Sequence, residues 1–508
     1  MQPVTLFAPF VHRNQTAKLA RALDKEKVYQ WLVTNGFFPE AYVLPPCFVV
    51  TSIPSYGKVY CTHKPTSFKP RITEYQQVHF PKTDYTDRTF GVIDPELHSD
   101  IAYAFASNWK TVLGAIFHPK NKVCSYSFPV PLDSKNLGSV GSLRSGRMIY
   151  EFIEMAENDI AAIAHRFKFL IKSDVKNFYP SIYTHSIPWA LHGKRKIRKV
   201  ENRQNYSFVG NRIDKLFQYA NDQCTNGLPI GPAVSDIAAE LVMSAVDREL
   251  SESIPDDAIV VRFKDDYRIL VRDESAGRTI IKALQAALKS YRLELNDEKT
   301  LFYSLPNGIF RDWVSQYHAA NRLPRTYYSF RRFKETYLSV VAIDSANAGC
   351  GVIDRFLADI ITKKYRVRVK LDKRTLPKVL SLLLMLGSLR TKAYPKVLAI
   401  IEAILQSPFG KTHAVAIAEH LANHLSHLSE KEVENRYLIA WICYFLRANS
   451  LHDHMLAKYN YKDPIVRAAY TSRFTLYKHC KDFKVFLSVK QAAKKTSLLR
   501  HLDVFKPQ

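Results

Sequence analysis

Cysteines are few in this chain, and none are spaced as a pair that would bind zinc. The 508 residues include an odd number of them: Cys47, Cys61, Cys124, Cys224, Cys350, Cys443 and Cys480. A scattered, odd set argues against a disulfide framework and fits a reducing compartment. We therefore expect a cytoplasmic protein without disulfide bonds.

A signal peptide and long apolar runs are missing as well. The first residues, MQPVTLFAPFVHRNQ, have no charged region before their short apolar run, so we do not expect a signal peptide. The longest apolar run, 379–389, is bounded by Lys378 and Arg390 and is too short to cross a bilayer. The sequence predicts no association with a membrane.

Acidic residues are strongly outnumbered. The chain has 47 Asp and Glu against 73 Lys and Arg, a net charge of +26. Such an imbalance favours a polyanionic partner, most simply nucleic acid or nucleotides. Because 47% of the residues are hydrophobic, a large core is expected, and the length allows roughly two to four domains.

The region up to about residue 140 is rich in proline, tyrosine and phenylalanine. Stretches such as AYVLPPCFVVTSIPSYGKVY predict short strands and loops with few long helices. A segment punctuated by glycine and serine follows, and the pattern over 148–166 then predicts a helix.

The middle of the chain alternates between strand and helix patterns. We expect strands over 166–174 and 293–305, helices over 234–250 and 276–292, and a β-hairpin over 258–273. This order predicts an antiparallel sheet with helices on one face.

After about residue 345 the strand signal fades and helical patterns follow one another. They cover 352–365, 376–389, 394–405, 413–428 and 434–448. The echo of LPKVL at 376 in YPKVL at 394 fits stacked helical repeats of the HEAT type, and a plain helical bundle fits equally well.

Two adjacent aspartates, Asp265 and Asp266, stand at the centre of the expected hairpin. Neighbouring carboxylates repel one another unless a cation lies between them. One interpretation is a solvated turn, because aspartate is a common turn residue. The other is a divalent-metal site for phosphoryl chemistry.

Three further features flank this pair along the chain. Asp174 ends an apolar strand, where it could bind a metal ion or cap the next helix. The stiff loop NGLPIGPAVSD contains Gly231 and leads into a helix, and its backbone is open to close approach. Lys299 follows in LELNDEKT, at a boundary between strand and turn.

This ordered set resembles motifs A, B, C and D of reverse transcriptases. SDVKNFYPSI resembles motif A, GLPIGPAVSDIAAEL motif B, FKDD the Tyr-x-Asp-Asp of motif C, and the Lys299 segment motif D. The resemblance implies an α+β fold, a right-hand polymerase palm and fingers followed by an all-α, HEAT-like C-terminal domain. It divides the chain into an N-terminal and fingers region (1–165), a palm (166–310) and a helical domain (311–508).

The resemblance also implies roles for single residues. Asp174, Asp265 and Asp266 would bind two Mg²⁺ ions, for which Mn²⁺ can substitute, and Lys299 would assist the departing pyrophosphate. The residues implied to contact the incoming dNTP are Phe178, Tyr179, Arg144, Arg147 and Gly231, with Tyr179 under the sugar, where it tends to exclude a 2′-hydroxyl. Packing within the palm is the other interpretation of Tyr179, as solvation is of Lys299.

Two departures from the family pattern narrow the resemblance. Ile230 replaces the usual glutamine of motif B, and no primer-grip hairpin follows Lys299. A palm fused to a large helical region is similar to the abortive-infection reverse transcriptases of bacteria, which defend against phage. That resemblance implies template-independent DNA synthesis by a homo-oligomer, with the single-stranded DNA product attached to a protein hydroxyl. Candidate priming residues are Tyr56, Tyr60, Tyr327 and Tyr328.

Two other functions stay open: a conventional RNA-templated reverse transcriptase, and a nucleic-acid-binding scaffold with an inactive palm. Segments 192–203, 325–334 and 363–370 interleave basic and aromatic residues, which suits single strands, although each could be a solvated charged face. His420, His424 and His427 share a helical stripe beside leucines, which favours the polar flank of a packed helix over a metal site.

Overall fold

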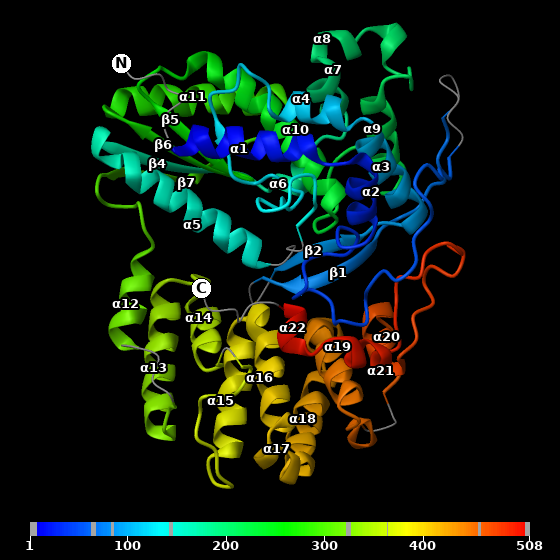
Figure 1. Cartoon of the computed structure of the whole chain (residues 1–508), viewed down its shortest axis with the longest axis vertical. Coiled ribbons are helices and arrows are strands. Elements are labelled where there is room, and N and C mark those ends of the chain that lie inside the picture. Colours follow the sequence, from blue (N-terminus) through cyan, green and yellow to red (C-terminus); the bar gives the residue numbers. More distant parts are fainter. Residues whose placement is uncertain are drawn as a thin grey trace.

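A computed structural model of the chain describes residues 8–61, 68–82, 86–141, 146–321, 327–362, 364–455 and 459–502, with only the backbone of 146–152. Its upper part, in the view of Figure 1, combines a β-sheet with helices, and its lower part consists of helices. In the part of the chain that is described, no helix has the length and apolar character needed to span a membrane.

The N-terminal region contains the predicted short strands and loops, but also four helices, so the expectation of few long helices was wrong for α1 and α3. Its elements are α1 (Ala8–Ala22), α2 (Lys25–Val33), α3 (Pro95–Ser107), α4 (Trp109–Ile116) and the antiparallel ribbon β1 (Gln76–Pro81) and β2 (Asp87–Val92). Proline is tolerated in the first turn of a helix, and Pro95 stands there, after the capping residue Asp94. Aromatic residues such as Tyr29 and Phe105 fill the core between these helices instead of marking strands.

A five-stranded sheet forms the centre of the upper part. In spatial order its strands are β3 (Cys124–Ser125), β5 (Ile259–Phe263), β6 (Asp266–Val271), β4 (Phe169–Val175) and β7 (Leu295–Ser304). All neighbours are antiparallel except β3 and β5, which run parallel. The predicted strand, hairpin and second strand of the middle region are thereby confirmed.

Helices cover both faces of this sheet, not one face as expected. On one face, Ile171 and Ile269 join a core with α10 (Ala233–Leu250) and α11 (Glu274–Ser290). On the other, Leu170 and Leu270 pack with Ile160 of α5 (Gly146–Ile163). Successive side chains of β4 point to opposite faces of the sheet. Leu170, Lys172 and Asp174 therefore share one face, which α5 covers only in part.

Between β4 and α10 the chain forms short helices, of which α7 and α8 lie at the upper edge of Figure 1. They are α6 (Phe178–Ser181), α7 (Ser186–His192), α8 (Lys194–Ile197) and α9 (Val209–Tyr219). The loop over 226–232 then leads into α10.

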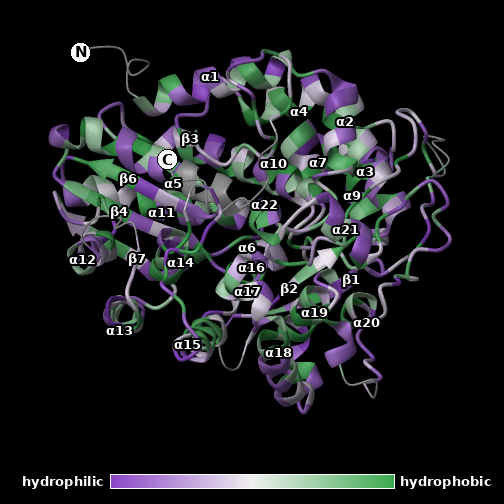
Figure 2. Cartoon of the chain, turned by 60° about the horizontal axis from the view of Figure 1, so that its bottom comes forward, coloured by the Kyte–Doolittle hydropathy of each residue, from purple (hydrophilic) through white to green (hydrophobic). Residues whose placement is uncertain are grey.

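The remaining chain is helical, as the sequence predicts. Its helices are α12 (Asp312–Ala320), α13 (Phe330–Ala346), α14 (Val352–Asp359), α15 (Leu376–Leu389), α16 (Tyr394–Gln406), α17 (Pro408–Thr412), α18 (Ala414–Ser429), α19 (Glu432–Ala448), α20 (Pro464–Thr471), α21 (Val489–Lys495) and α22 (Leu498–Leu502). Figure 2 shows hydrophilic and hydrophobic residues together on these helices, as amphipathic packing requires. Consecutive helices pack in pairs, α15 against α16 and α18 against α19. Stacked repeats and a bundle both remain compatible with this pairing.

The end of the chain returns to the N-terminal region. Thr51 donates its amide proton to Lys484, and Leu487 donates to Cys47, at 2.7 and 2.9 Å. The ribbon of β1 and β2 rests on α19, where the rings of Phe80 and Tyr437 lie 4.9 Å apart. The helical part is therefore joined to the upper part at both of its ends.

Candidate active site

The two adjacent aspartates lie at the turn between β5 and β6. Phe263 pairs with Asp266 across the hairpin, so Lys264 and Asp265 form a two-residue turn. Lys264 has a φ of +51°, in the left-handed region that such tight turns demand and that residues other than glycine seldom adopt. The turn therefore brings Asp265 within reach of the charges of Asp266 and Asp174.

Asp174 meets this turn from the neighbouring strand. It pairs in register with Asp266, and the amide of Val175 donates to the Asp265 carbonyl at 3.2 Å. This register places the three aspartates side by side, and their role stays a prediction. The alternative that Asp174 caps the next helix is not, because α6 begins after Asn177 and has no side-chain cap.

The carboxylates raise one another's pKa. Loss of solvation, followed by the charges of Asp266 and Asp174, raises the pKa of Asp265 to about 7. Asp266 keeps an exposed edge, but the protein around it and the charge of Asp174 raise its pKa to about 6. A fully solvated turn would leave both groups near their usual pKa values. Here Asp174 pairs with Asp266, which brings a third carboxylate to the turn.

Asp174 itself is 7% exposed and uses only one of its two oxygens. Oδ2 accepts an ion-paired hydrogen bond from Lys299 Nζ at 2.5 Å. Oδ1 is buried and has no hydrogen-bond donor. A buried carboxylate oxygen without a donor, next to two repelling carboxylates, is the kind of site that a hard divalent cation would satisfy.

A tighter potential metal cluster lies elsewhere. Among the described residues, the group of three ligand atoms within 4.8 Å of one another is formed by Asp94, His479 and Cys480. Arg71 lies against two of them, 2.7 Å from Asp94 Oδ2 and 2.8 Å from His479 Nε2, so a guanidinium already supplies the positive charge. The three aspartates at the turn do not form a group of this tightness.

Phe178 and Tyr179 follow Asp174 on α6, and only Tyr179 has a surface toward the site. Phe178 is buried in the core, 5% exposed. The Tyr179 hydroxyl donates a short hydrogen bond to Asp236, in the first turn of α10. Lys264 Nζ lies 3.5 Å from Asp236 and 5.8 Å from the centre of the Tyr179 ring. Tyr179 is thus fixed beside the aspartate turn by two residues that the sequence did not single out.

The loop that resembles motif B packs against the N-terminal region. Gly231 has a φ of +119°, and a Cβ there would lie 2.7 Å from the ring of Pro39, so only glycine fits. Ile230 accepts a backbone hydrogen bond from Gly91 at 2.9 Å and pairs with Phe90 of β2. The backbone of this loop was expected to be approached closely by another group. In this structure that group is the N-terminal region of the same chain.

Basic residues surround the aspartates. Lys172 shares their face of β4, and burial beside Arg268 lowers the pKa of its ammonium. Arg268 and Arg311 both pair with Glu157 of α5, at 3.5 and 3.1 Å. Of the arginines expected to hold a triphosphate, Arg144 lies outside the described residues, and Arg147 is described only as backbone at the start of α5.

The four candidate priming tyrosines differ in exposure. Tyr56 packs between Tyr29 and Tyr103, and Tyr60 donates to Asp482 at 3.1 Å. Tyr327 is 48% exposed, whereas Tyr328 is 1% exposed and donates to Asn321. Among these four, Tyr327 has the exposed side chain that a hydroxyl reaching the aspartates would need.

For the segments that interleave basic and aromatic residues, single-strand binding stays a prediction. In 192–203, Arg195, Lys196, Arg198 and Lys199 are exposed around α8, while 325–334 and 363–370 fall partly outside the described residues. His424 is half-buried, and loss of solvation lowers its pKa to about 4, while His427 is 78% exposed. No described trio of ligand atoms within 4.8 Å includes a histidine of this stripe.

A family model described as "Reverse transcriptase (RNA-dependent DNA polymerase)" matches residues 133–334. This range is less than half of the chain and contains all four motif-like segments. No curated protein matches the sequence.

Similar solved structures include telomerases from two yeasts. The telomerase from Candida tropicalis truncated from its C-terminal domain is 13% identical, with a TM-score of 0.32, over 47% of this chain and 52% of that one. The apo telomerase from Candida tropicalis is 12% identical, with a TM-score of 0.34, over 83% and 71%. A Candida albicans telomerase in complex with a TWJ fragment of telomeric RNA is 13% identical, with a TM-score of 0.27, over 68% and 64%. The chain therefore spans about half of the first of these structures, and the likeness is loose.

Proposed function

We propose that the chain is a metal-dependent nucleotidyltransferase that adds deoxynucleotides to a growing DNA strand. The observation that carries this proposal is the facing of Asp174 and Asp266 across β4 and β6, with Asp265 beside them and one buried oxygen of Asp174 without a donor. In this proposal the sheet with α10 and α11 is the palm of a right-hand polymerase, and residues before 166 supply its fingers.

The three aspartates would hold two Mg²⁺ or Mn²⁺ ions. Such ions stabilise the attacking and departing oxygens of nucleotidyl transfer. Filling the site removes the repulsion that raises the pKa of Asp265 and Asp266. It also competes for Asp174, which frees Lys299 to approach the departing pyrophosphate as a cation.

Tyr179 would select the sugar. Its hydroxyl is tied to Asp236, and its ring lies beside the turn that carries Asp265. A ring held there leaves little room for a 2′-hydroxyl, so deoxynucleotides would be preferred. Lys264, near the same ring, adds a positive charge for a phosphate.

The priming mode is the finer part of the proposal. We infer protein-primed, template-independent synthesis by a homo-oligomer in antiphage defence, with the DNA attached to a tyrosine. Supporting it, Ile230 stands in place of glutamine and is engaged with β2, and the chain continues into a helical domain in place of a thumb. A templated reverse transcriptase and an inactive scaffold are the alternatives.

One experiment separates these three functions. The purified protein is incubated with labelled dNTPs and Mg²⁺ or Mn²⁺, with and without an RNA template and primer. Label that stays with the protein in the absence of a template supports the proposal, and activity that needs the template supports the conventional enzyme. Incorporation under neither condition would favour the scaffold.

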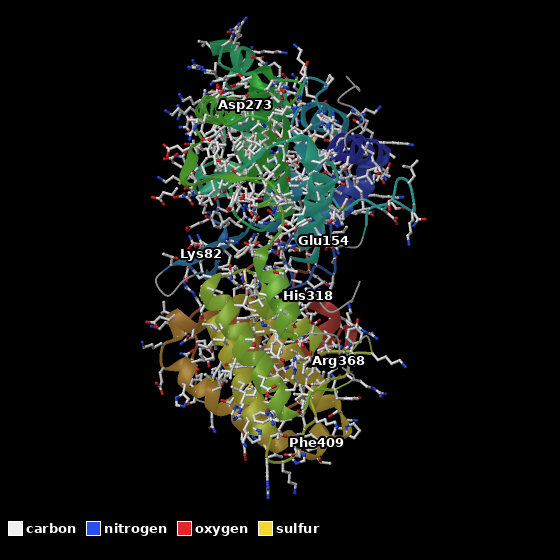
Figure 3. All side chains as sticks on the ribbon, turned by 90° about the vertical axis from the view of Figure 1, so that its left-hand side faces the viewer. Lys82, Glu154, Asp273, His318, Arg368 and Phe409 are labelled. Carbon is white, nitrogen blue, oxygen red and sulfur yellow. The ribbon has the colours of Figure 1, made fainter. Side chains whose placement is uncertain are left out.

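Matched variants tie the result to the site. Asp265→Asn is expected to abolish incorporation, because the site loses charge that two ions require. Asp273→Asn is the control, because Asp273 lies at the far end of β6, in the upper part of Figure 3, and asparagine still caps α11. Full activity in Asp265→Asn would remove the two-ion assignment. In a bacterial host, the same variant should lose any protection against phage.

A further inference from the structure

A cluster of buried charges lies directly behind the aspartate turn. Arg262, on β5, is 1% exposed, and its guanidinium lies 2.8 Å from Glu240 Oε1 and 2.8 Å from Asp247 Oδ2. Both carboxylates belong to α10 and are 4% and 2% exposed. Tyr267 of β6 donates to the same Asp247 at 2.7 Å. Two carboxylates and one guanidinium are thus enclosed between helix and hairpin.

Stability alone does not explain such a cluster. Buried ion pairs recover their desolvation only with very good geometry, and apolar residues of similar size often serve the fold as well. A more specific explanation is that the charged groups make hydrogen bonds that apolar residues could not make.

What it holds is the Lys264 peptide. Arg262 Nη1 donates to the Lys264 carbonyl at 2.9 Å. On the other side, Ser127 Oγ accepts the Lys264 amide proton at 3.0 Å and donates to Glu240 Oε2 at 3.1 Å. Both backbone groups of Lys264 are therefore bound, directly or through Ser127, to the charges on α10.

Lys264 is the residue whose conformation sets the direction of the turn. Its left-handed φ of +51° is unfavourable for lysine and persists only where the surroundings enforce it. Asp265 follows it immediately, so a rotation of the Lys264 peptide would swing that carboxylate away from Asp174. A displacement of about 1 Å is enough to impair a metal or catalytic site.

We propose that Arg262, with Glu240 and Ser127, is a positioning residue that fixes the Lys264 peptide and so aims Asp265 at the metal site. The inference rests on the proposed function, because it concerns the same aspartates. In this inference, carboxylates of α10 fix the geometry of the ion site through the Arg262 guanidinium, which itself contacts neither ion nor nucleotide.

Mn²⁺ binding tests the inference without recourse to activity. Free Mn²⁺ is measured by electron paramagnetic resonance during titration of the full-length protein, and Asp265→Asn identifies the binding that belongs to the site. Arg262→Lys keeps the charge but cannot reach Glu240, Asp247 and the Lys264 carbonyl together. It is expected to weaken this binding roughly 10-fold to 100-fold, the usual effect of losing a residue that orients ligands.

The control is a buried ion pair far from the turn. Lys396, on α16, is 3% exposed and pairs with Asp354 of α14. Lys396→Met should destabilise the protein but leave the Mn²⁺ affinity unchanged. If Arg262→Lys fails to fold, Ser127→Ala decides, since it deletes one hydroxyl and should still weaken Mn²⁺ binding several-fold.

The outcomes separate the two proposals. A folded Arg262→Lys, or in its place Ser127→Ala, with wild-type Mn²⁺ affinity overturns the positioning role and leaves the proposed function standing. If the wild-type protein shows no binding that Asp265→Asn removes, the ion site itself is refuted, and the positioning role with it. Loss of affinity in the Arg262 and Ser127 variants, but not in Lys396→Met, supports the inference.

Discussion

At the scale of single residues, environment decides what an aspartate does. Asp273 and Asp265 flank the same strand, β6. Hydrogen bonds from the Ala276 amide and the Ser275 hydroxyl hold the pKa of Asp273 below its usual value. Loss of solvation and two neighbouring carboxylates instead raise the pKa of Asp265 to about 7. The first group stabilises a helix, and the second stores repulsion that a cation would relieve.

This repulsion predicts a pH dependence of stability without metal. In the unfolded chain Asp265 and Asp266 lose their protons near pH 4, but in the fold they do so near pH 7 and 6. Between these values the folded state binds more protons, so its stability falls as pH rises through this window. The thermal midpoint in EDTA should therefore drop from pH 5 to pH 8, and Mg²⁺ should restore it at pH 8.

Asp265→Asn should flatten that fall and raise the midpoint at pH 8, while Asp273→Asn should behave as wild type. Asp174→Asn differs from Asp265→Asn, because Asp174 is paired with Lys299 and its removal leaves that lysine without its carboxylate partner. We expect no gain in midpoint from it. Equal thermal midpoints for wild type and Asp265→Asn at pH 8 would contradict the repulsion between the carboxylates.

Sugar selection is the second prediction for a single residue. Tyr179→Val removes the ring beside the turn and should raise incorporation of ribonucleotides relative to deoxynucleotides roughly 10-fold or more, a size typical of a changed pocket wall. Tyr179→Phe keeps the ring and loses only the hydroxyl bonded to Asp236, so it should keep the wild-type preference. The ratio of kcat/KM for the two nucleotides measures both, and an unchanged ratio in Tyr179→Val would leave Tyr179 as packing alone.

The sequence predicted Asp174, Asp265, Asp266 and Tyr179 because chemistry of this kind needs those residue types in that order. It gave no signal for Asp236, Lys264 or Arg262. Asp236 contacts Tyr179, Lys264 contacts Asp236, and Arg262 contacts Glu240, over 57, 28 and 22 positions of the chain. These partners lie on different elements, so only the packing of the strands against α10 brings them together. Gly231 was noticed as a point of close approach, but its neighbour, Pro39, comes from a region with no pattern linking the two.

At the scale of elements, periodicity was the reliable signal. The helix expected over 376–389 has those bounds in α15, and the hairpin and α10 lie where they were expected. The N-terminal helices were missed because α2 and α3 are buried over most of their surface and show little amphipathic contrast. The early end of α14 was missed as well, since Ile360 and Ile361 continue its apolar pattern into a turn.

One element boundary carries a prediction of its own. Asp94 is 3% exposed, caps α3 through the Glu96 amide at 3.1 Å, and pairs with Arg71 and His479. Asp94→Ala should lower stability by roughly 2–4 kcal/mol, because it removes a cap and the buried carboxylate that Arg71 and His479 contact. Chemical denaturation followed by circular dichroism measures the loss.

Asp482 is the matched control for Asp94. It also joins the returning end of the chain to the N-terminal region, through Lys58 and Tyr60, but on the surface. Because exposed ion pairs contribute little, Asp482→Ala should shift the unfolding midpoint far less than Asp94→Ala. A larger loss from Asp482→Ala would mean that the junction is held by its surface contacts.

At the scale of the whole molecule, the helical part makes direct contacts with the upper part in addition to the chain connection after β7. Tyr437 of α19 donates to the Tyr42 carbonyl, and His501 of α22 lies 3.0 Å from the Ala41 carbonyl. Sequence alone could not predict this, since the partners are about 400 residues apart and are joined by backbone carbonyls. Surfaces of the helical part are therefore held at a defined place relative to the aspartates, which matters for a primer carried on the protein.

The last prediction concerns that primer. A hydroxyl on the chain reaches the site at high effective concentration, provided that it is exposed and on a segment able to move. Tyr327 is 48% exposed just before α13, whereas its neighbour Tyr328 is buried and pairs with Val369 in the helical part. Tyr327→Phe should abolish label attached to protein, and Tyr328→Phe should retain it wherever the fold survives. After nuclease digestion, mass spectrometry should find the residual nucleotide on Tyr327. A nucleotide on Tyr56 or Tyr60 would move the primer to the N-terminal region, and free DNA without any protein adduct would replace protein priming by ordinary reverse transcription.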